Sequence, residues 1–347
     1  MRSFPLVLGF VLLTVVSWGV YGPVLHHGQI GMGLPEAGTG KVIPSRWLPF
    51  ICVGLAYFLI AVLVPWARLL FWGERGRWTH RGTLYSLVAG AVGALGALGV
   101  ILAFNFGGSP LYVMPLIFGG APVVNTVFSM ILGKTYRQVR LPFLVGLALV
   151  VAGAALVLIY KPAGGGPASR EAQFWPVALS VLMTMLCWGA YGPVLHIGQA
   201  AMQGSRMRPF MCVGLAYFLI AVLIPLAILQ LQQAPGGQWT AAGTAWSLAA
   251  GAAGALGALG VILAFDFGGK PVYVMPLVFG GAPVVNTLTG TAEALLAGKP
   301  LAFQGLFLAG LVAVIAGAVM VLVFAPRAGH PPPQPAAAEG APQAASG

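Results

Sequence analysis

Apolar residues fill ten long stretches of this chain, and only short polar connections separate them. Each stretch has about 20 residues or more, which is the length that crosses the hydrocarbon core of a bilayer as a helix. The stretches cover about 4–26, 47–72, 83–106, 110–132, 141–160, 174–197, 207–231, 242–266, 270–297 and 301–325. The pattern predicts an all-α polytopic membrane protein with ten transmembrane helices.

The last five stretches repeat the first five. SWGVYGPVLHHGQ, which begins at Ser17, matches CWGAYGPVLHIGQ, which begins at Cys187. The 44 residues that start at Thr83 differ from the 44 that start at Thr244 at eight positions, so 36 are identical. Repetition on this scale indicates a tandem duplication of a five-helix unit.

The odd number of helices in each unit determines how the two units are oriented. If the first unit enters the membrane from one side, the second enters from the other, and an axis in the membrane plane relates them. We therefore expect a first repeat at 1–160, a second repeat at 174–325 and an external linker at 161–173, which contains GGGP. Residues 326–347 are rich in Pro and Ala and predict a disordered cytoplasmic tail.

Composition and charge support a membrane protein and indicate its orientation. Hydrophobic residues make up 59% of the chain and charged residues 7%, whereas a soluble domain has about 25% charged residues. The net charge of +11 does not indicate a nucleic-acid partner, because the 17 Lys and Arg lie singly or in small groups between the apolar stretches. Twelve of them fall on the face that holds the N-terminus: Arg2, Arg68, Arg75, Arg77, Arg81, Lys134, Arg137, Arg140, Arg206, Arg208, Lys270 and Arg327. Since positive charge concentrates on the cytoplasmic side, we expect both termini to be cytoplasmic and the protein to lie in a bacterial cytoplasmic membrane.

Glycine and proline interrupt the fourth helix of each repeat at matching places. The residues concerned are Gly119, Gly120 and Pro122 in the first repeat and Gly280, Gly281 and Pro283 in the second. A proline removes a backbone donor, and glycine tolerates unusual dihedral angles, so we expect both helices to kink or unwind near the middle. Such paired interruptions are typical of a transporter's binding site. Asn125 and Asn286 follow three residues after the prolines and would offer amide groups to a ligand beside the break. The alternative is a structural role, in which each proline kinks its helix and the Asn side chain forms a hydrogen bond between helices.

The first helix of each repeat ends in the motif WGxYGPVLHxGQ. Trp18 and Tyr21, with Trp188 and Tyr191, combine apolar ring faces with a polar group and suit a cavity that stacks on a ligand. The competing explanation is the aromatic belt at the membrane surface. His26 and His196 are candidates for a gate or a proton carrier, because histidine titrates near neutral pH.

Two acidic residues lie within the predicted spans. Asp266 is also a candidate proton carrier, since a charge inside a membrane is costly and usually functional. However, the first repeat has Asn105 at that position and Ser109 where the second has Lys270. Because acid and base occur together four residues apart, we expect Asp266 to form a local ion pair with Lys270. Glu293 lies in an extension of the ninth helix, and the sequence offers no account of it.

Enzyme chemistry and cofactors find no support in the sequence. The spans contain no paired carboxylates, no HExxH motif and no Cys/His cluster with metal-ligand spacing. The three cysteines lie in apolar stretches and behave as small hydrophobic residues. We therefore expect no enzyme activity, no metal and no cofactor.

The ten helices in two inverted halves, the Trp-Gly late in the first helix, and the proline-containing fourth helix that ends in Gly133-Lys134 resemble the drug/metabolite transporter superfamily, bacterial EamA type. The resemblance covers about residues 4–325. It implies transport of a small polar organic metabolite, sugar-like or amino-acid-like, by alternating access. It also implies a central cavity with these substrate-binding candidates: Trp18, Tyr21, Tyr112, Asn125, Trp188, Tyr191, Tyr273 and Asn286.

Two other classes of function share this architecture. A flippase for a lipid-linked substrate would open sideways to the bilayer, and a membrane scaffold or receptor would carry no solute flux. The expected partners are a small-molecule substrate and the lipid bilayer, and a homodimer is one option for assembly.

The charge distribution makes a topology prediction. In a variant without Cys52, Cys187 and Cys212, a Gly165→Cys change in the linker should react with a membrane-impermeant maleimide added outside the cell. A Ser346→Cys change in the tail should react only after the membrane is opened. Labelling of residue 165 from the inside alone would contradict the orientation.

Overall fold

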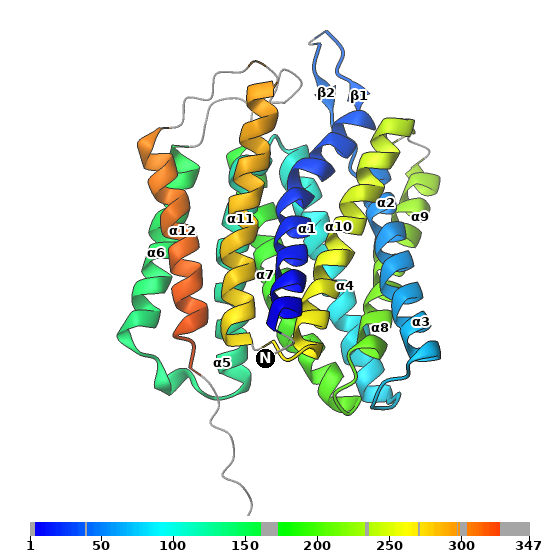
Figure 1. Ribbon diagram of the computed structural model, residues 1–347. Helices are drawn as coiled ribbons and strands as arrows, with labels where there is room; N and C mark the ends of the chain where they lie inside the picture. Colours follow the sequence, from blue (N-terminus) through cyan, green and yellow to red (C-terminus); the bar gives the residue numbers. More distant parts are fainter. Residues whose placement is uncertain are drawn as a thin grey trace, which may run out of the picture.

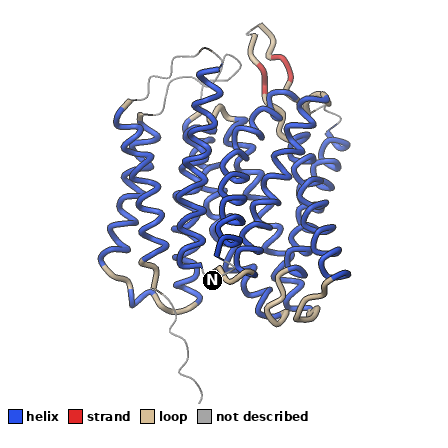
Figure 2. The backbone as a smooth tube through the Cα atoms, viewed as in Figure 1, coloured by secondary structure: helices blue, strands red, loops and turns tan. Residues whose placement is uncertain are grey.

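The apolar stretches form helices wherever the computed structural model describes them. The described residues are 4–38, 40–160, 173–232, 236–269, 271–296, 298 and 304–326. Within these ranges, nine helical segments are long and apolar enough to cross a membrane, and Figure 2 shows how completely helix dominates the chain. The protein is therefore a polytopic helical membrane protein.

The nine segments share lengths of 19 to 28 residues. They are α1 (Phe4–Gly31), α2–η1–α3 (Trp47–Phe71), α4 (His80–Asn105), α5 (Pro110–Leu132), α6 (Leu141–Ile159), α7 (Phe174–Ala201), α8–η3–α9 (Met207–Gln232), α10 (Ala241–Asp266) and α12 (Gly305–Val323). A further helix, α11 (Pro271–Leu296), packs against α1, α5 and α12 in the same bundle (Figure 1). A two-stranded hairpin of β1 (Leu34–Pro35) and β2 (Val42–Ile43) occupies the loop after α1, for which the sequence predicted no structure.

The second segment of each repeat contains a π-helical turn that the sequence did not predict. The turns cover η1 (Leu59–Leu63) and η3 (Phe218–Leu223). Each ends two residues before a proline, which is the second residue of α3 (Val64–Phe71) or α9 (Ile224–Gln232). Pro65 and Pro225 cannot donate a backbone hydrogen bond, and their rings conflict with the preceding α-helical turn. Widening the helix by one residue accommodates each proline without breaking the span.

The first helix of each repeat packs on the third helix of the other repeat. In the α1–α10 pair, the Trp18 indole N–H donates to the carbonyl of Gly254 at 3.2 Å. In the α7–α4 pair, the Trp188 indole N–H donates to the carbonyl of Gly93 at 3.1 Å. These residues are equivalent in the two repeats, so the same bond is made twice and ties the repeats to each other.

A second pair of equivalent contacts lies one helical turn away. The Thr14 hydroxyl donates to the carbonyl of Gly257, and the Thr184 hydroxyl donates to the carbonyl of Gly96, both at 3.0 Å. A Cβ atom at Gly96 or Gly257 would overlap the facing indole ring. Glycine is therefore required at these two positions for the helices to approach closely.

The glycines of α5 and α11 have a different role from the one expected. Both helices continue without interruption through Gly119–Pro122 and Gly280–Pro283, so the expected unwinding does not occur. A Cβ atom on Gly119 would overlap Val314 of α12, and one on Gly120 would overlap Met185 of α7. The glycines leave room for side chains of neighbouring helices to pack closely against the proline-containing helices.

The last helices of the repeats, α6 and α12, pair along glycines at one edge of the bundle (Figure 1). A Cβ atom on Gly317 would lie 2.6 Å from the carbonyl oxygen of Gly146 and 2.7 Å from the backbone nitrogen of Val150. These are backbone atoms, which cannot rotate away as a flexible side chain would.

This packing predicts that Gly317→Ala lowers the stability of the folded protein in detergent. Overpacking of this kind typically costs about 1–3 kcal/mol, which thermal unfolding can detect. Gly305→Ala, in the same helix but with nothing within 4 Å of the added Cβ, is the matched control and should unfold like the parent. An equal midpoint for both variants would contradict this account of the α6–α12 pair.

Candidate functional site

A cavity of about 280 Å³ lies among α1, α2, α4, α5, α7, α8, α10 and α11, and residues of both repeats line it. Aromatic side chains form much of its wall and come in four pairs of repeat-equivalent residues: Trp18 and Trp188, Tyr21 and Tyr191, Tyr57 and Tyr217, Phe118 and Phe279. We call these eight residues the aromatic box.

The rings of the aromatic box contact one another across the two repeats. Tyr57 and Tyr217 stack face to face, with ring centroids 3.8 Å apart and an interplanar angle of 4°. The Tyr21 ring meets Trp188 edge-on at 6.1 Å. Because both tryptophan N–H groups already bond to backbone carbonyls, the indoles offer a ligand their ring surfaces rather than a donor.

Tyr21 differs from the tryptophans in what it offers. Its side chain is 4% exposed, and its buried hydroxyl has no hydrogen-bond partner. A buried hydroxyl without a partner loses its hydration and gains nothing in return. Since Tyr21 lines the cavity, a bound molecule with a polar atom would satisfy it.

Apart from the tyrosines of the aromatic box, the polar side chains of the cavity wall gather at one end. These residues, Asn125, His196, Gln199 and Arg206, define what we call the open end. His196 is exposed and the Arg206 side chain keeps 31% of its surface accessible, so the cavity reaches the surface here. The N-terminus lies at the same end, because Phe10 of α1 stacks on Phe267 with ring centroids 5.4 Å apart.

Two of the equivalent residues, Gln29 and Asn286, are buried and hydrogen-bonded at the opposite end, which we call the sealed end. Gln29, the counterpart of Gln199, is fully buried, and its amide donates to the carbonyls of Ile101 at 3.0 Å and Ser45 at 3.2 Å. Asn286, the counterpart of Asn125, donates to the carbonyl of Pro110 at 2.8 Å.

Apolar counterparts follow the same division. At the sealed end, Phe104 is 1% exposed and Met114 is fully buried. Their equivalents Phe265 and Met275 line the cavity and are only partly buried. Nearly identical sequences therefore occupy a packed environment at one end and a cavity wall at the other.

An ion pair lies beside the open end. Arg206 Nη1 is 2.9 Å from Asp266 Oδ1 and also donates to the carbonyl of Ile262 at 3.4 Å. Asp266 was expected to pair with Lys270, which lies outside the described residues. Among the described residues, the acid pairs with Arg206, which is 60 residues away in sequence and adjacent in space. The pair with Lys270 stays a prediction.

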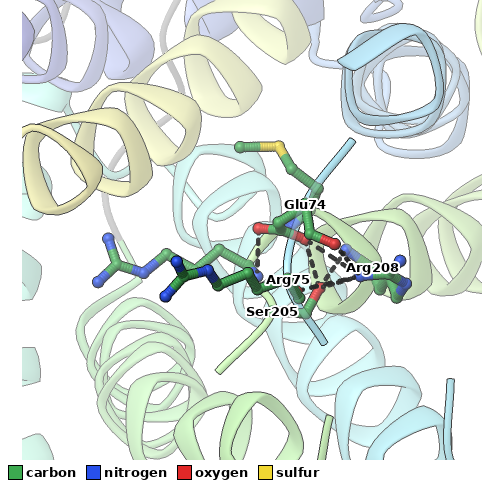
Figure 3. Close-up of polar contacts among 6 residues, drawn as sticks. Glu74, Arg75, Ser205 and Arg208 are labelled. Carbon is green, nitrogen blue, oxygen red and sulfur yellow. Dashed lines mark hydrogen bonds and ion pairs between the residues drawn. The ribbon is translucent and has the colours of Figure 1, made fainter. Parts of the chain in front are cut away.

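Glu74, which the sequence did not single out, fixes the backbone next to Arg206. Its carboxylate accepts from the backbone N–H of Arg206 at 2.8 Å and of Met207 at 3.2 Å, and from the Ser205 hydroxyl. Figure 3 shows the carboxylate between Ser205 and Arg208, whose guanidinium lies 3.6 Å away. An acid at a helix N-terminus satisfies free backbone donors, so Glu74 anchors the start of α8.

Glu293, which the sequence left without explanation, pairs with His27 Nε2 at 3.2 Å. This contact joins α11 to α1 beyond the sealed end. His26, a candidate gate or proton carrier, precedes His27 in the sequence. It does not line the cavity, whereas its counterpart His196 does.

The eight predicted substrate-binding residues divide into two groups. Trp18, Tyr21, Asn125, Trp188 and Tyr191 line the cavity. The remaining three, Tyr112, Tyr273 and Asn286, lie outside its wall and pack between helices. The sequence missed Tyr57, Tyr217, Phe118 and Phe279, which the repeat could have revealed as matched aromatic positions in the second and fourth helices.

The part of the chain that the structure describes contains no set of metal ligands. No group of three or more His, Cys, Asp or Glu residues there is arranged to hold an ion. The three cysteines are free thiols.

Comparisons with known proteins support the fold alone. The sequence matches no protein-family profile and no curated protein. One solved structure, described only as the crystal structure of a protein, aligns with a TM-score of 0.54 over 90% of this chain and 98% of that chain, at 16% identity. The chain thus shares its overall architecture with a solved protein.

The Arg206–Asp266 pair predicts a coupled effect on stability. Asp266→Asn and Arg206→Gln should each destabilise the protein in detergent, and the double variant should lose less than the sum of the two. Because the pair is partly exposed, the coupling should be about 0.2–1 kcal/mol. The control is Lys270→Ser, which introduces the residue found at the equivalent position of the first repeat. If the stability effect of Asp266→Asn were coupled to Lys270 rather than to Arg206, the expected Asp266–Lys270 ion pair would be supported.

Proposed function

We propose that this protein is a secondary transporter of the drug/metabolite transporter type, built as a ten-helix inverted repeat, which moves a small polar organic metabolite by alternating access. The observation that carries the proposal is the contrast between Gln29 and Gln199. The two residues are equivalent, yet Gln29 is buried and bonded at the sealed end while Gln199 lines the cavity at the open end.

The duplication provides a physical basis for a second conformation. Since the two ends are built from nearly the same sequence, exchanging their environments replaces each contact with an equivalent one. In the exchanged state, Gln199 donates to the carbonyls of Ile262 and Ser205, and Gln29 lines the cavity. Two conformations that differ by such exchanges are separated by a small free-energy difference, which a bound solute can shift.

The two conformations are not identical in energy, because the repeats differ near the ends. The open end has the Arg206–Asp266 pair, whereas the sealed end has Asn105 at the position of Asp266, with its amide bonded to the carbonyl of Pro44. Closing the open end would bury this ion pair further, and burying charges costs free energy. The protein therefore favours the conformation with the open end accessible.

The charge distribution orients this cycle in the membrane. With both termini in the cytoplasm, the open end faces the cytoplasm and the sealed end faces outward. The cavity is then ready to accept a solute from inside the cell.

Solute flux into proteoliposomes is the direct test. Purified protein should move a radiolabelled member of a panel of sugars, amino acids, nucleosides and aromatic acids faster than protein-free vesicles do. No flux for any member of the panel would favour a scaffold or receptor, and scrambling of a fluorescent lipid-linked compound would favour a flippase.

Alternating access also predicts opposite effects of two equivalent mutations. Gln29→Leu removes the two hydrogen bonds that Gln29 donates to the carbonyls of Ser45 and Ile101 at the sealed end. Their loss costs about 1–3 kcal/mol and should shift the population toward the outward-open state by roughly 5- to 150-fold. Gln199→Leu should shift it the other way.

Cysteine reporters can measure both shifts in the variant without native cysteines. Met275→Cys lies on the present cavity wall, and Met114→Cys is its buried counterpart. Gln29→Leu should speed maleimide labelling of residue 114 and slow that of residue 275. Faster labelling at both positions would indicate general loosening and contradict the exchange.

A further inference from the structure

The cavity offers far more aromatic surface than hydrogen-bonding groups. The aromatic box contributes eight rings and four tyrosine hydroxyls, and the other polar side chains of the wall gather at the open end. A polyhydroxylated solute would bury several hydroxyls against ring faces, where each lacks a partner and loses its hydration. A flat aromatic ring, in contrast, stacks on such walls without that loss.

The polar groups are arranged at two places along the cavity. Within the box lie the hydroxyls of Tyr21, Tyr57, Tyr191 and Tyr217, and that of Tyr21 is buried without a partner. At the open end, Arg206 is the cation of the wall, and Nη1 makes its contacts with Asp266 and the carbonyl of Ile262. A guanidinium carries five N–H donors, so donors beyond those on Nη1 remain for a ligand.

Among the described residues, the cavity wall contains no carboxylate, because Asp266 lies beside the wall rather than in it. A cationic ligand would therefore lie near the positive charge of Arg206, and no acid of the wall would pair with the ligand. A ligand carboxylate would meet a guanidinium, with the amides of Gln199 and Asn125 as further donors.

We propose that this site binds a small planar aromatic carboxylate, with its ring in the aromatic box against the Tyr57–Tyr217 stack and its carboxylate toward Arg206. This inference rests on the proposed transport function, whose metabolite it narrows to one chemical class. The volume of about 280 Å³ limits the ligand to about two fused rings with a short side chain. Tyr21 donates to or accepts from a polar atom on the ring, such as a ring nitrogen.

Binding in detergent tests this inference without relying on transport. Isothermal titration with indole-3-acetate should give an affinity at least 10-fold higher than cyclohexylacetate, which has the same charge without a planar ring. The affinity should also exceed that of tryptamine, which has the same ring with a cation, and of glucose. Glucose or cyclohexylacetate binding as tightly as indole-3-acetate would overturn the proposal.

Two variants test the assigned contacts. Tyr21→Phe removes one hydroxyl and should weaken indole-3-acetate binding by about 2- to 10-fold, whereas Tyr136→Phe, at a residue 54% exposed, should bind like the parent. Arg206→Gln should reduce or abolish the preference for indole-3-acetate over tryptamine. If Arg206→Gln unfolds, the same preference can be measured in Asp266→Asn. This change leaves the guanidinium of Arg206 without its acid and should strengthen the preference for indole-3-acetate over tryptamine. An unchanged preference in both variants would contradict the role of Arg206.

The outcomes for the two proposals can be separated. Binding of indole-3-acetate without flux of any solute would sustain the aromatic site and refute transport. Flux of glucose without binding of indole-3-acetate would sustain transport and refute the aromatic site.

Discussion

The structure depends on the close approach of the first helix of each repeat to the third helix of the other. Two glycines, Gly96 and Gly257, make this approach feasible, because any side chain there would overlap an indole ring. The indole N–H groups of Trp18 and Trp188 then bond to backbone carbonyls on the facing helix. Inside a membrane the hydrophobic effect does not drive helices together, so close packing and such bonds provide the association. The two repeats are consequently interlocked, and neither can bury its own first helix alone.

The cavity follows from this interlocking. The two helix pairs, α1–α10 and α4–α7, supply Trp18, Tyr21, Trp188 and Tyr191 to the aromatic box, and the equivalent helices α2 and α8 bring Tyr57 and Tyr217 face to face. Because each repeat contributes the same positions, the aromatic box consists of matched pairs. Under the proposed function, the same rings would contact the solute in both conformations while the ends open and close around it.

The repeats differ in charge at the open end. Glu74 anchors the backbone at Arg206, and Arg206 in turn pairs with Asp266. At the sealed end, Ser45, the counterpart of Ser205, donates to the carbonyl of Gly236. Asn105 stands there at the position of Asp266. Duplication alone would yield two equivalent ends. These few charged residues make the ends unequal and give Arg206 a fixed position at the cavity.

The sequence alone determined the membrane class, the helical spans and the duplication, because apolar length and repetition are local properties that can be counted along the chain. It also identified Trp18, Tyr21, Trp188 and Tyr191, since a motif that occurs twice with ring and polar groups is conspicuous without any coordinates. The nine described spans agree with that prediction within a few residues at most ends. The ten-helix inverted arrangement and its orientation stay predictions.

Only the tertiary structure decided which residues share the cavity and which are sealed. Asn125 and Asn286 are indistinguishable in sequence, yet one lines the cavity and the other is bonded to Pro110. Their difference arises from the conformation of the whole bundle, which no local pattern encodes. The contact between Asp266 and Arg206 was likewise decided by folding, because packing of the helices brings together two residues that are 60 positions apart in sequence. Glycine and proline in α5 and α11 indicated a break, but neighbouring side chains fill the space that glycine leaves, and packing keeps both helices continuous.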